Sequence, residues 1–422
     1  MVCRKLEISQ RGIDMPASPI RKLAPLAYKA EDEGVKIYRL NIGQPDLPTP
    51  KQALDCLKNI NRTILEYSPS QGYLSLREAL VGYYERYQIN LSPDEIIITS
   101  GGSEAVLFAF MSCLNPGDEI IIPEPAYANY MSFAISAGAV IRTVTTTIDE
   151  GFCLPKIEKF EELINERTKA ILICNPNNPT GYLYTQREMN QIRDIVRKHN
   201  LYLFSDEVYR EFIYTGSPYI SAMHLNGIEQ NVVLIDSVSK RYSECGIRIG
   251  ALITKNENVR KTVMKFCQAR LSPPLIGQII AEASIEGTEQ YSRSVYEEYT
   301  ERRKTLIDGV NRIPGCYTPI PMGAFYTVAK LPVDDAEKFC AWCLTDFRYC
   351  DDKTASLTPS GNNRYPPIGE TVMMAPAAGF YTNRELGKDQ VRLAYVLCKD
   401  DLLRALMILE KAINEYNNRE KN

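Results

Sequence analysis

The stretch Val232-Val233-Leu234-Ile235-Asp236-Ser237-Val238-Ser239-Lys240 joins a short apolar run to a lysine. The apolar run is typical of a strand buried inside a sheet. A lysine directly after such a strand is unusual, because removing an ammonium group from water is costly unless the group is neutralised or reacts. Ser237, Ser239 and Arg248 flank it and are residue types that bind phosphate. The stretch therefore indicates either a Schiff-base lysine beside a phosphate clamp or an ordinary surface lysine.

Outward from this stretch, short apolar strands alternate with helices. Strands are expected at 96–98, 119–122, 170–174, 201–204 and 232–235. The alternation predicts an α/β fold with a largely parallel sheet and crossover helices. In such sheets ligands gather at the carboxyl ends of the strands. Five residues that suit ligand binding fall at those ends: Gly102, Tyr127, Asn178, Asp206 and Lys240.

Local signals mark a phosphate turn and the starts of two helices. Gly101-Gly102-Ser103 links a strand to a helix, an arrangement in which free backbone N–H groups and the helix dipole hold a phosphate. The turn lacks the Walker lysine and the GxGxxG spacing, so neither nucleoside triphosphate nor dinucleotide binding is supported. The capping-box spacings at Ser75 to Glu78 and at Thr185 to Glu188 predict that helices begin there.

Composition describes an ordinary globular protein. The chain has 422 residues, 45% hydrophobic residues and a net charge of -3, enough for two packed units. No charge is concentrated and no apolar run could span a membrane, so we expect no nucleic-acid or membrane partner and a cytoplasmic location. Cys340 and Cys343 have metal-like spacing, but no second pair or nearby histidine completes a zinc set. We expect a core helix there and no metal.

The remaining segments predict a second unit. The stretch 289–310 has the pattern of a long charged helix that bridges to it, and 351–369 has the polar, proline-bearing composition of a mobile surface loop or insertion. Strand 391–396 carries Arg392 in an otherwise apolar run, either on an exposed face or as a buried carboxylate receptor. A glycine and proline turn at Gly43 is either a plain connector or a close approach to a ligand.

Taken in order, these motifs resemble the class I/II pyridoxal-phosphate-dependent aminotransferases over nearly the full chain. They are Tyr67 before Gly72, Gly101-Gly102, Pro125-x-Tyr127, Asn175-Pro-x-Asn-Pro-Thr-Gly181, Asp206-x-x-Tyr209, Ser237-x-Ser-Lys240 and Arg248. The resemblance implies the α/β fold of the PLP-dependent transferases, fold type I. It assigns 1–46 to an N-terminal arm and part of a small domain. It further assigns 47–310 to a large PLP-binding domain with a mostly parallel seven-stranded sheet, and 311–422 to a small α+β domain.

The resemblance also implies how pyridoxal 5'-phosphate is held. Lys240 would bind it covalently as a Schiff base and act as the catalytic base. Asp206 would face the pyridine nitrogen and keep it protonated. Asn178 and Tyr209 would hydrogen-bond the phenolic oxygen of the ring, and Tyr127 would stack on its face.

For the phosphate and the subunit assembly, the resemblance implies five residues. Gly102, Ser103, Ser237 and Arg248 would hold the phosphate. Tyr67 would reach it from the other subunit, which makes a homodimer the expected active form.

The substrate residues follow from the same resemblance. Arg392, with Gly43 and Asn178, would bind the α-carboxylate, because the arginine fork suits a planar partner. Ser103 stands where some relatives place a lysine for the distal carboxylate. Arg270 could serve instead, or it could be a structural arginine in a proline turn.

The stretch 370–381 looks like the C-terminal part of prokaryote-type aspartate aminotransferases. It favours amino transfer from L-aspartate to 2-oxoglutarate by a ping-pong cycle. The alternatives are another donor, such as an aromatic amino acid or alanine, or a β-lyase on the same scaffold. A non-enzymatic ligand-responsive domain is disfavoured, because every catalytic residue type is present and no DNA-binding module is attached. Glu244, close to the expected phosphate site, has no physical explanation in the sequence.

Overall fold

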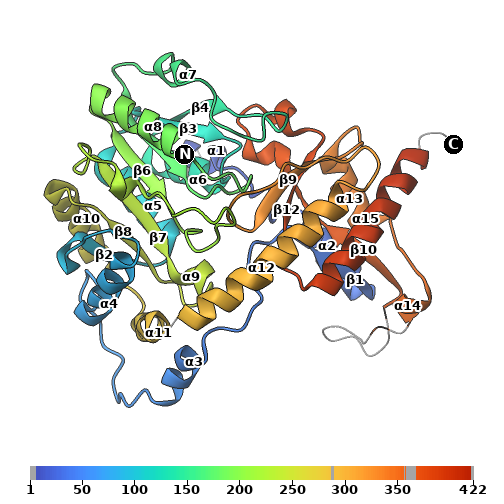
Figure 1. Ribbon diagram of the computed structural model, residues 1–422, viewed down its shortest axis with the longest axis horizontal. Helices are drawn as coiled ribbons and strands as arrows, with labels where there is room; N and C mark the ends of the chain where they lie inside the picture. Colours follow the sequence, from blue (N-terminus) through green and yellow to red (C-terminus); the bar gives the residue numbers. More distant parts are fainter. Residues whose placement is uncertain (1–5, 287–288, 356, 358–366, 420–422) are drawn as a thin grey trace, which may run out of the picture.

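The larger sheet has seven strands in the order β2-β8-β7-β6-β5-β3-β4 (Figure 1). The computed structural model describes residues 6–286, 289–355, 357 and 367–419. The strands are β2 (Ile96–Thr99), β3 (Glu119–Glu124), β4 (Val140–Thr145), β5 (Thr168–Cys174), β6 (Tyr202–Asp206), β7 (Val232–Ser237) and β8 (Gly250–Ile253). Neighbours from β7 to β4 pair in parallel, and β8 is antiparallel to both β7 and β2. The predicted mostly parallel sheet is confirmed.

Helices cover both faces of this sheet. They include α4 (Leu74–Glu85), α5 (Gly102–Cys113), α6 (Asn129–Ala137), α8 (Gln186–His199), α10 (Glu257–Arg270) and α11 (Leu275–Ile285). Successive side chains of β5 point to opposite faces of the sheet. Leu172 packs in the hydrophobic cluster that contains α5, whereas Ile171 and Ile173 pack in the cluster that contains α8. The near-continuous apolar strands of the sequence therefore reflect burial on both faces.

One of the two predicted capping boxes is present and the other is absent. Thr185 caps α8: its side chain accepts from the Glu188 N–H, and the Glu188 carboxylate accepts from the Thr185 N–H. At Ser75 the predicted helix start is correct to within one residue, but the capping box is absent, because α4 begins at Leu74 and Ser75 lies inside it. The Ser75 hydroxyl instead donates to Glu282 Oε2 of α11 at 2.8 Å. The hydroxyl that a local cap would use is therefore bonded to a residue distant in the sequence.

A second set of strands joins the two ends of the chain. β1 (Val35–Arg39) pairs in parallel with β10 (Gly369–Met373), and β12 (Gln390–Ala394) lies between β11 (Ala375–Pro376) and β9 (Tyr326–Lys330). The long helix α12 (Glu289–Val310) crosses from the large sheet towards these strands (Figure 1), where α13 (Ala336–Thr345) and α15 (Lys399–Arg419) pack. The division of the chain at 46/47 and 310/311 stays a prediction.

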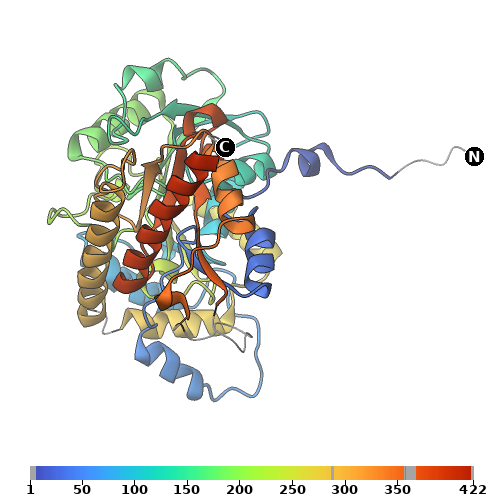
Figure 2. The same cartoon turned by 90° about the vertical axis from the view of Figure 1, so that its right-hand side faces the viewer.

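The other helices are short: α1 (Gln10–Asp14), α2 (Ala24–Asp32), α3 (Lys51–Lys58), α7 (Glu158–Glu161), α9 (Val238–Arg241), α14 (Asp352–Ala355), η1 (Pro93–Glu95), η2 (Ala222–His224), η3 (Ala377–Phe380) and η4 (Arg384–Gly387). Figure 2 shows α1 standing away from the rest of the protein. α14 lies in the segment predicted to be a loop, and Asp351 just before it is paired with Arg404. Residues 356 and 358–366 of that segment lie outside the described residues.

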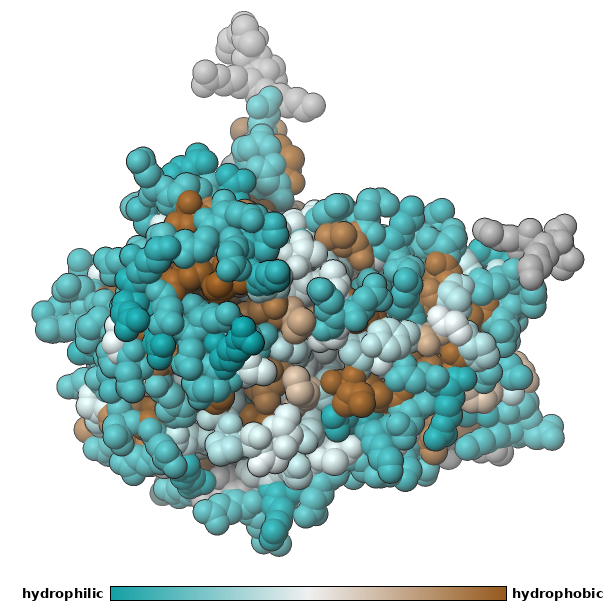
Figure 3. Space-filling model, turned by 45° about the horizontal axis from the view of Figure 1, so that its top comes forward, coloured by the Kyte–Doolittle hydropathy of each residue, from teal (hydrophilic) through white to brown (hydrophobic). Residues whose placement is uncertain are grey.

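Surface and metal predictions can be compared with the same structure. Hydrophobic residues occur as separate patches on a mostly hydrophilic face (Figure 3). Among the described residues, no helix is long and apolar enough to cross a membrane. Cys340 and Cys343 are both buried on α13, as the core-helix interpretation requires. Within all the residues that the structure describes, no three or more His, Cys, Asp or Glu side chains come together in a way that could hold a metal ion.

Candidate active site

Three neighbouring strand ends bring the central residues together. In the sheet register Cys174 at the end of β5 lies opposite Asp206 at the end of β6, and Asp206 lies opposite Ile235 of β7. The chain then turns into α9, whose N-cap is Ser237: the Ser237 hydroxyl accepts from the backbone N–H of Ser239 at 3.2 Å. This single helical turn sets the position of the next residue, Lys240.

Lys240 points its amine to the backbone of another part of the chain. Its Nζ donates to the carbonyl of Gly43 at 2.9 Å and lies 3.5 Å from Cys245 Sγ. Burial lowers the pKa of the Lys240 ammonium, the Cys245 thiol opposes this, and the charges of Arg392 and Arg248 add to the lowering. No carboxylate among the described residues forms an ion pair with it. A lowered pKa favours the neutral amine, which is the nucleophilic and basic form.

Asp206 is a buried carboxyl group with an unusual pKa. Burial raises its pKa to about 6, although hydrogen bonds from Tyr130 and Val208 favour the ionised form. The Tyr130 hydroxyl donates to Asp206 Oδ2 at 2.6 Å. A carboxyl group in this range can share a proton with a basic ring nitrogen.

Tyr130 was not singled out from the sequence. Its ring meets that of Tyr127 edge-on, with centroids 5.4 Å apart. The available signal was the i, i+3 spacing of the two tyrosines after β3. That spacing indicates a shared face, but not the contact with a carboxylate on β6.

Arg392 is a buried cation that lacks a carboxylate partner within the described residues. Its side chain is in contact with neutral oxygens: Nη1 donates to Asn178 Oδ1 at 3.1 Å, and Nη2 donates to the carbonyl of Asn41. The guanidinium also lies over the rings of Tyr326 and Phe380, at 4.6 and 5.2 Å. Only 1% of the residue is exposed, and Nε has no hydrogen-bond partner. The interpretation of Arg392 as an exposed residue is therefore wrong, whereas its role as a carboxylate receptor stays a prediction.

A chain of hydroxyl and amide groups connects Arg392 to Lys240. Asn178 Nδ2 donates to the Tyr209 hydroxyl at 3.4 Å, and the hydroxyls of Tyr209 and Tyr326 are 3.0 Å apart. The Tyr326 hydroxyl in turn lies 3.4 Å from the Gly43 carbonyl that Lys240 contacts. A Cβ on Gly43 would lie 1.6 Å from that hydroxyl, so only glycine fits.

Tyr326 is the second residue that the sequence reasoning did not select. The sequence indicated only that a strand opens near it. Its hydroxyl is useful because of packing between the two ends of the chain, which a local pattern does not encode.

The start of α5 and Arg248 form a site suited to an anion. α5 begins at Gly102, and no side chain caps its first turn among the described residues. Gly101 has a φ of 79°, and a Cβ there would lie 2.3 Å from Arg248 Nη2. Arg248 is itself held by donation from Nη1 to the Cys245 carbonyl at 3.1 Å. Free N–H groups of Gly102 and Ser103, the helix dipole and a guanidinium together suit a phosphate.

Arg270 forms an ion pair with a residue of α5. Its Nη1 forms an ion pair with Glu104 Oε2 at 2.7 Å, and its Nη2 donates to the Ser70 carbonyl at 3.0 Å. Both contacts tie the turn after α10 to the start of α5. Of the two interpretations left open by the sequence, these contacts favour the structural arginine, because the guanidinium already has a carboxylate partner.

Glu244 faces away from the phosphate end. The Ser284 hydroxyl of α11 donates to Glu244 Oε1, whereas Oε2 is buried without a partner. Burial raises the pKa of Glu244 to about 7. Its place between α9 and α11 explains why a glutamate can stand so close in sequence to a phosphate site.

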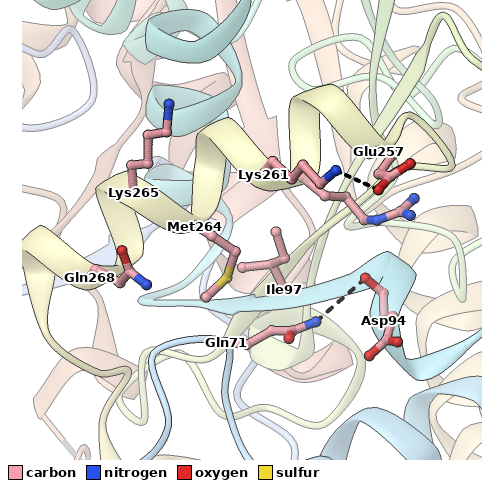
Figure 4. A pocket seen from close by; sticks show the side chains of 9 residues that line it. Gln71, Asp94, Ile97, Glu257, Lys261, Met264, Lys265 and Gln268 are labelled. Carbon is pink, nitrogen blue, oxygen red and sulfur yellow. Dashed lines mark hydrogen bonds and ion pairs between the residues drawn. The ribbon is translucent and has the colours of Figure 1, made fainter.

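A pocket of about 340 Å³ lies elsewhere, between β2 and α10 (Figure 4). Its charged groups have local partners: Lys261 is 2.6 Å from Glu257, and Gln71 donates to the carbonyl of Asp94. None of the Lys240 or Arg392 contacts lines it. The pocket therefore offers no chemistry comparable to that at the strand ends.

Comparison with known proteins decides the family. A family model described as aminotransferase class I and II matches residues 35–352. The chain belongs to this family. The members depend on pyridoxal phosphate, so that is the cofactor of this aminotransferase, and the resemblance seen in the sequence is confirmed.

Relatives match this aminotransferase along almost its whole length. The aspartate aminotransferase of Pyrococcus horikoshii is 30% identical over 422 residues, which cover 97% of this chain and 98% of that protein. The crystal structure of the Thermotoga maritima aspartate aminotransferase has a TM-score of 0.84 at 28% identity and covers 96% of this chain and 100% of that chain. An alanine aminotransferase from Pyrococcus furiosus has the same TM-score and identity, with 97% and 100% covered. The fold of this aminotransferase is thus fold type I.

The residues present fit pyridoxal phosphate. The uncapped start of α5 beside Arg248 suits its phosphate, and the carboxyl of Asp206 suits its ring nitrogen. The Lys240 amine, with its lowered pKa, suits its aldehyde.

Proposed function

We propose that this aminotransferase moves the amino group of L-aspartate to 2-oxoglutarate by a ping-pong cycle. The observation that carries the proposal is the buried Arg392 guanidinium. Its only polar contacts in the described chain are neutral oxygens, so a carboxylate that enters beside it would meet an uncompensated charge. Amino acids and 2-oxo acids both supply such a carboxylate. The names of the relatives from Pyrococcus horikoshii and Thermotoga maritima support aspartate as the donor.

The α-carboxylate of the substrate is held by Arg392 in this proposal. Asn178 and Asn41 fix the guanidinium from one side, and Tyr326 and Phe380 cover its faces. A guanidinium fixed in this way binds a planar carboxylate in one orientation. That orientation would bring the substrate Cα towards Lys240, because the Gly43 carbonyl that Lys240 contacts lies beside the Tyr326 hydroxyl, and the Tyr326 ring lies against the Arg392 guanidinium.

Proton transfer is assigned to Lys240. Bound pyridoxal phosphate supplies a ring that withdraws the electron pair left at the substrate Cα. The neutral amine of Lys240 removes the proton from Cα, and burial favours that neutral form. Asp206 holds a proton at the ring nitrogen, with Tyr130 fixing the carboxyl. Tyr209 and Asn178 would donate to the phenolic oxygen of the cofactor, and Tyr127 would pack on the ring.

The remaining cofactor contacts complete the proposal. Gly102, Ser103, Ser237 and Arg248 would hold the phosphate. Tyr67 is 76% exposed on this chain, and Ile64 and Leu65 beside it are 71% and 66% exposed. Exposed apolar residues in one segment are typical of a covered interface. We therefore infer a homodimer in which Tyr67 completes the neighbouring site. The cytoplasmic location expected from the sequence stays a prediction.

The deciding experiment uses the purified holoenzyme and one substrate. L-Aspartate alone should change the absorption spectrum of the bound cofactor and release one oxaloacetate per site. 2-Oxoglutarate should then restore the spectrum and release L-glutamate. Release of ammonia or pyruvate without this stoichiometry would point to elimination or decarboxylation instead. A response to L-alanine but not to L-aspartate would assign the donor seen in the name of the Pyrococcus furiosus neighbour.

A further inference from the structure

Arg21 lies in a turn that is bonded to the candidate site. Its backbone N–H donates to the Ser18 carbonyl at 3.1 Å, in the turn just before α2. The carbonyl of the preceding residue, Ile20, accepts from Asn41 Nδ2 at 3.1 Å. Asn41 also accepts, through its own carbonyl, from Arg392. Asn41 therefore connects Arg392 to the backbone next to Arg21.

Packing fixes the same turn against the site. A Cβ on Gly379 would lie 2.4 Å from Pro19 Cβ, so the two segments are in close contact. Ile20 packs on the apolar cluster that contains Phe380, whose ring lies under the Arg392 guanidinium. Ala128, next to the candidate stacking residue Tyr127, packs on that cluster too. Arg21 thus extends from a turn that packs beside Ala128 and Phe380, the neighbours of Tyr127 and Arg392.

The guanidinium of Arg21 is available to bind an anion, whereas the ammonium of Lys22 is already paired. Arg21 is exposed and has no ion pair or side-chain hydrogen bond among the described residues. Lys22, the next residue, forms an ion pair with Glu337 at 2.5 Å. Burial raises the pKa of the Tyr127 phenol, Arg392 lowers it, and Arg21 is one of the further cations that lower it. Arg21 is therefore near enough to Tyr127 for its charge to act on that phenol.

We propose that Arg21 binds the distal carboxylate of a dicarboxylic substrate. Its turn is hydrogen-bonded through Asn41 to Arg392, which would bind the α-carboxylate, so the two guanidinium groups would recognise the two ends of one ligand. The inference rests on the proposed function and names the selectivity residue that Arg270 does not supply. Aspartate, oxaloacetate, glutamate and 2-oxoglutarate all carry two carboxylates, so one receptor serves both halves of a ping-pong cycle.

The proposed contact gives selectivity without loss of folding stability. With no ligand, Arg21 remains hydrated and no buried charge has to be neutralised. A distal carboxylate that reaches it forms charge-assisted hydrogen bonds inside a partly closed site, and these are strong interactions. A substrate without that carboxylate gains nothing from Arg21. Dicarboxylic ligands should therefore be preferred over monocarboxylic ligands of the same length.

Equilibrium binding to the holoenzyme tests this preference without turnover. The probes are succinate and glutarate, which have two carboxylates, and butyrate, which has one and matches succinate in length. Their dissociation constants are measured from the change in the cofactor spectrum for the wild type, R21M, R21K and K22M. We expect the preference for succinate over butyrate to fall about 10- to 100-fold in R21M, because one set of charged hydrogen bonds is lost.

The controls separate a specific role from a general one. R21K should recover part of the preference, since it retains the charge but not the fork. K22M changes the adjacent residue of the same turn, whose charge is already paired, and should retain the wild-type preference. A thermal melt of each variant shows whether the fold is unchanged. If K22M loses as much preference as R21M, a general electrostatic effect replaces the proposal.

The outcomes also distinguish this inference from the proposed function. If L-aspartate is converted to oxaloacetate but R21M has the wild-type preference, the inference is wrong and the function stands. If R21M loses the preference but no donor gives amino transfer, the dicarboxylate site stands and the function is wrong.

Discussion

Arg392, on β12 of the three-stranded sheet, and Arg210, just after β6 of the large sheet, are both buried arginines, but only Arg210 is paired with carboxylates among the described residues. Arg210 Nη2 forms an ion pair with Glu207 Oε2 at 2.9 Å, and its Nη1 lies 3.8 Å from Asp236 Oδ2. Arg392 meets only amide and carbonyl oxygens and two aromatic faces among the described residues. A buried charge that is already paired stabilises its surroundings, whereas one without a counter-charge is free to bind a ligand.

The pKa directions express the same difference. Burial lowers the pKa of Arg210, but Tyr84, Tyr83 and the two carboxylates more than reverse this, so the pKa lies well above its ordinary value. Burial also lowers the pKa of Arg392, and there its tyrosine neighbours do not reverse the change. The first arginine belongs to the framework, and the second is positioned to gain from a carboxylate.

The strongest test of the comparison is R210M. It leaves Glu207 buried without its cation, so we expect the free energy of unfolding to fall by about 3–5 kcal/mol. Urea unfolding followed by circular dichroism measures this loss. R197M removes an exposed arginine paired with Asp194 and should cost less than about 1 kcal/mol. Equal losses for the two variants would contradict the structural role given to Arg210.

The complementary variant is R392M. It removes the carboxylate receptor but leaves no carboxylate unpaired, so stability should change little or rise. The value of kcat/KM for L-aspartate should fall about 100- to 1000-fold, the loss of two charge-assisted hydrogen bonds. Steady-state kinetics and a thermal melt together measure the contrast with R210M. A large loss of stability with little loss of activity would reverse the two assignments.

Glu244 is a buried acid that can be compared with the two buried arginines, because its Oε2 has no hydrogen-bond partner among the described residues. Its pKa is about 7 in the folded protein and near 4.5 in an unfolded chain, so unfolding releases a proton between these pH values. Stability contributed by the protonated carboxyl is therefore complete at low pH and is lost as pH rises through 7. E244Q should be more stable than the wild type by about 2–3 kcal/mol at pH 8, and the difference should vanish near pH 4.

Urea unfolding over this pH range measures the change. An E244Q advantage that is equal at pH 4 and pH 8 would show that ionisation is not its cause. E257Q, on the surface of α10, provides a control, because the Glu257 carboxylate is exposed and paired with Lys261.

The smallest expected effect concerns Cys245. Its thiol lies 3.5 Å from Lys240 Nζ and opposes the lowering of the lysine pKa. C245A should lower that pKa further and move the pH dependence of cofactor capture to lower pH, with kcat changed by less than about tenfold. The rate of pyridoxal phosphate uptake by the cofactor-free protein, measured against pH, tests this. A shift to higher pH would contradict the assigned contact.

Local patterns predicted what local contacts determine. The apolar strands, the α8 cap at Thr185 and the position of Lys240 after β7 depend on residues close in sequence, and the structure contains all three. The capping box predicted at Ser75 is absent, and the Ser75 hydroxyl is bonded to Glu282 of α11 instead. The sequence could not decide between the two interpretations of Arg270 for a related reason. Its counter-charge, Glu104, lies far away in the sequence.

The residues that sequence reasoning missed share one property. Tyr130, Tyr326 and Asn41 act through hydrogen bonds to residues on other strands or at the other end of the chain. Their neighbours in sequence give no sign of these contacts. Arg21 is the extreme case, because what marks it is the lack of a side-chain partner within the described part of the chain.

The pairing of β1 with β10 has a consequence for synthesis on the ribosome. All strands of the large sheet have been made once residue 253 has emerged, so Asp206 and Lys240 can be in place early. β1 must wait for β10, roughly 330 residues later, which is about 15–70 s at ordinary elongation rates. Arg392 follows later still. A nascent chain can therefore acquire its cofactor end before it can recognise a substrate, and a chain terminated before β10 would have a pocket that recognises none.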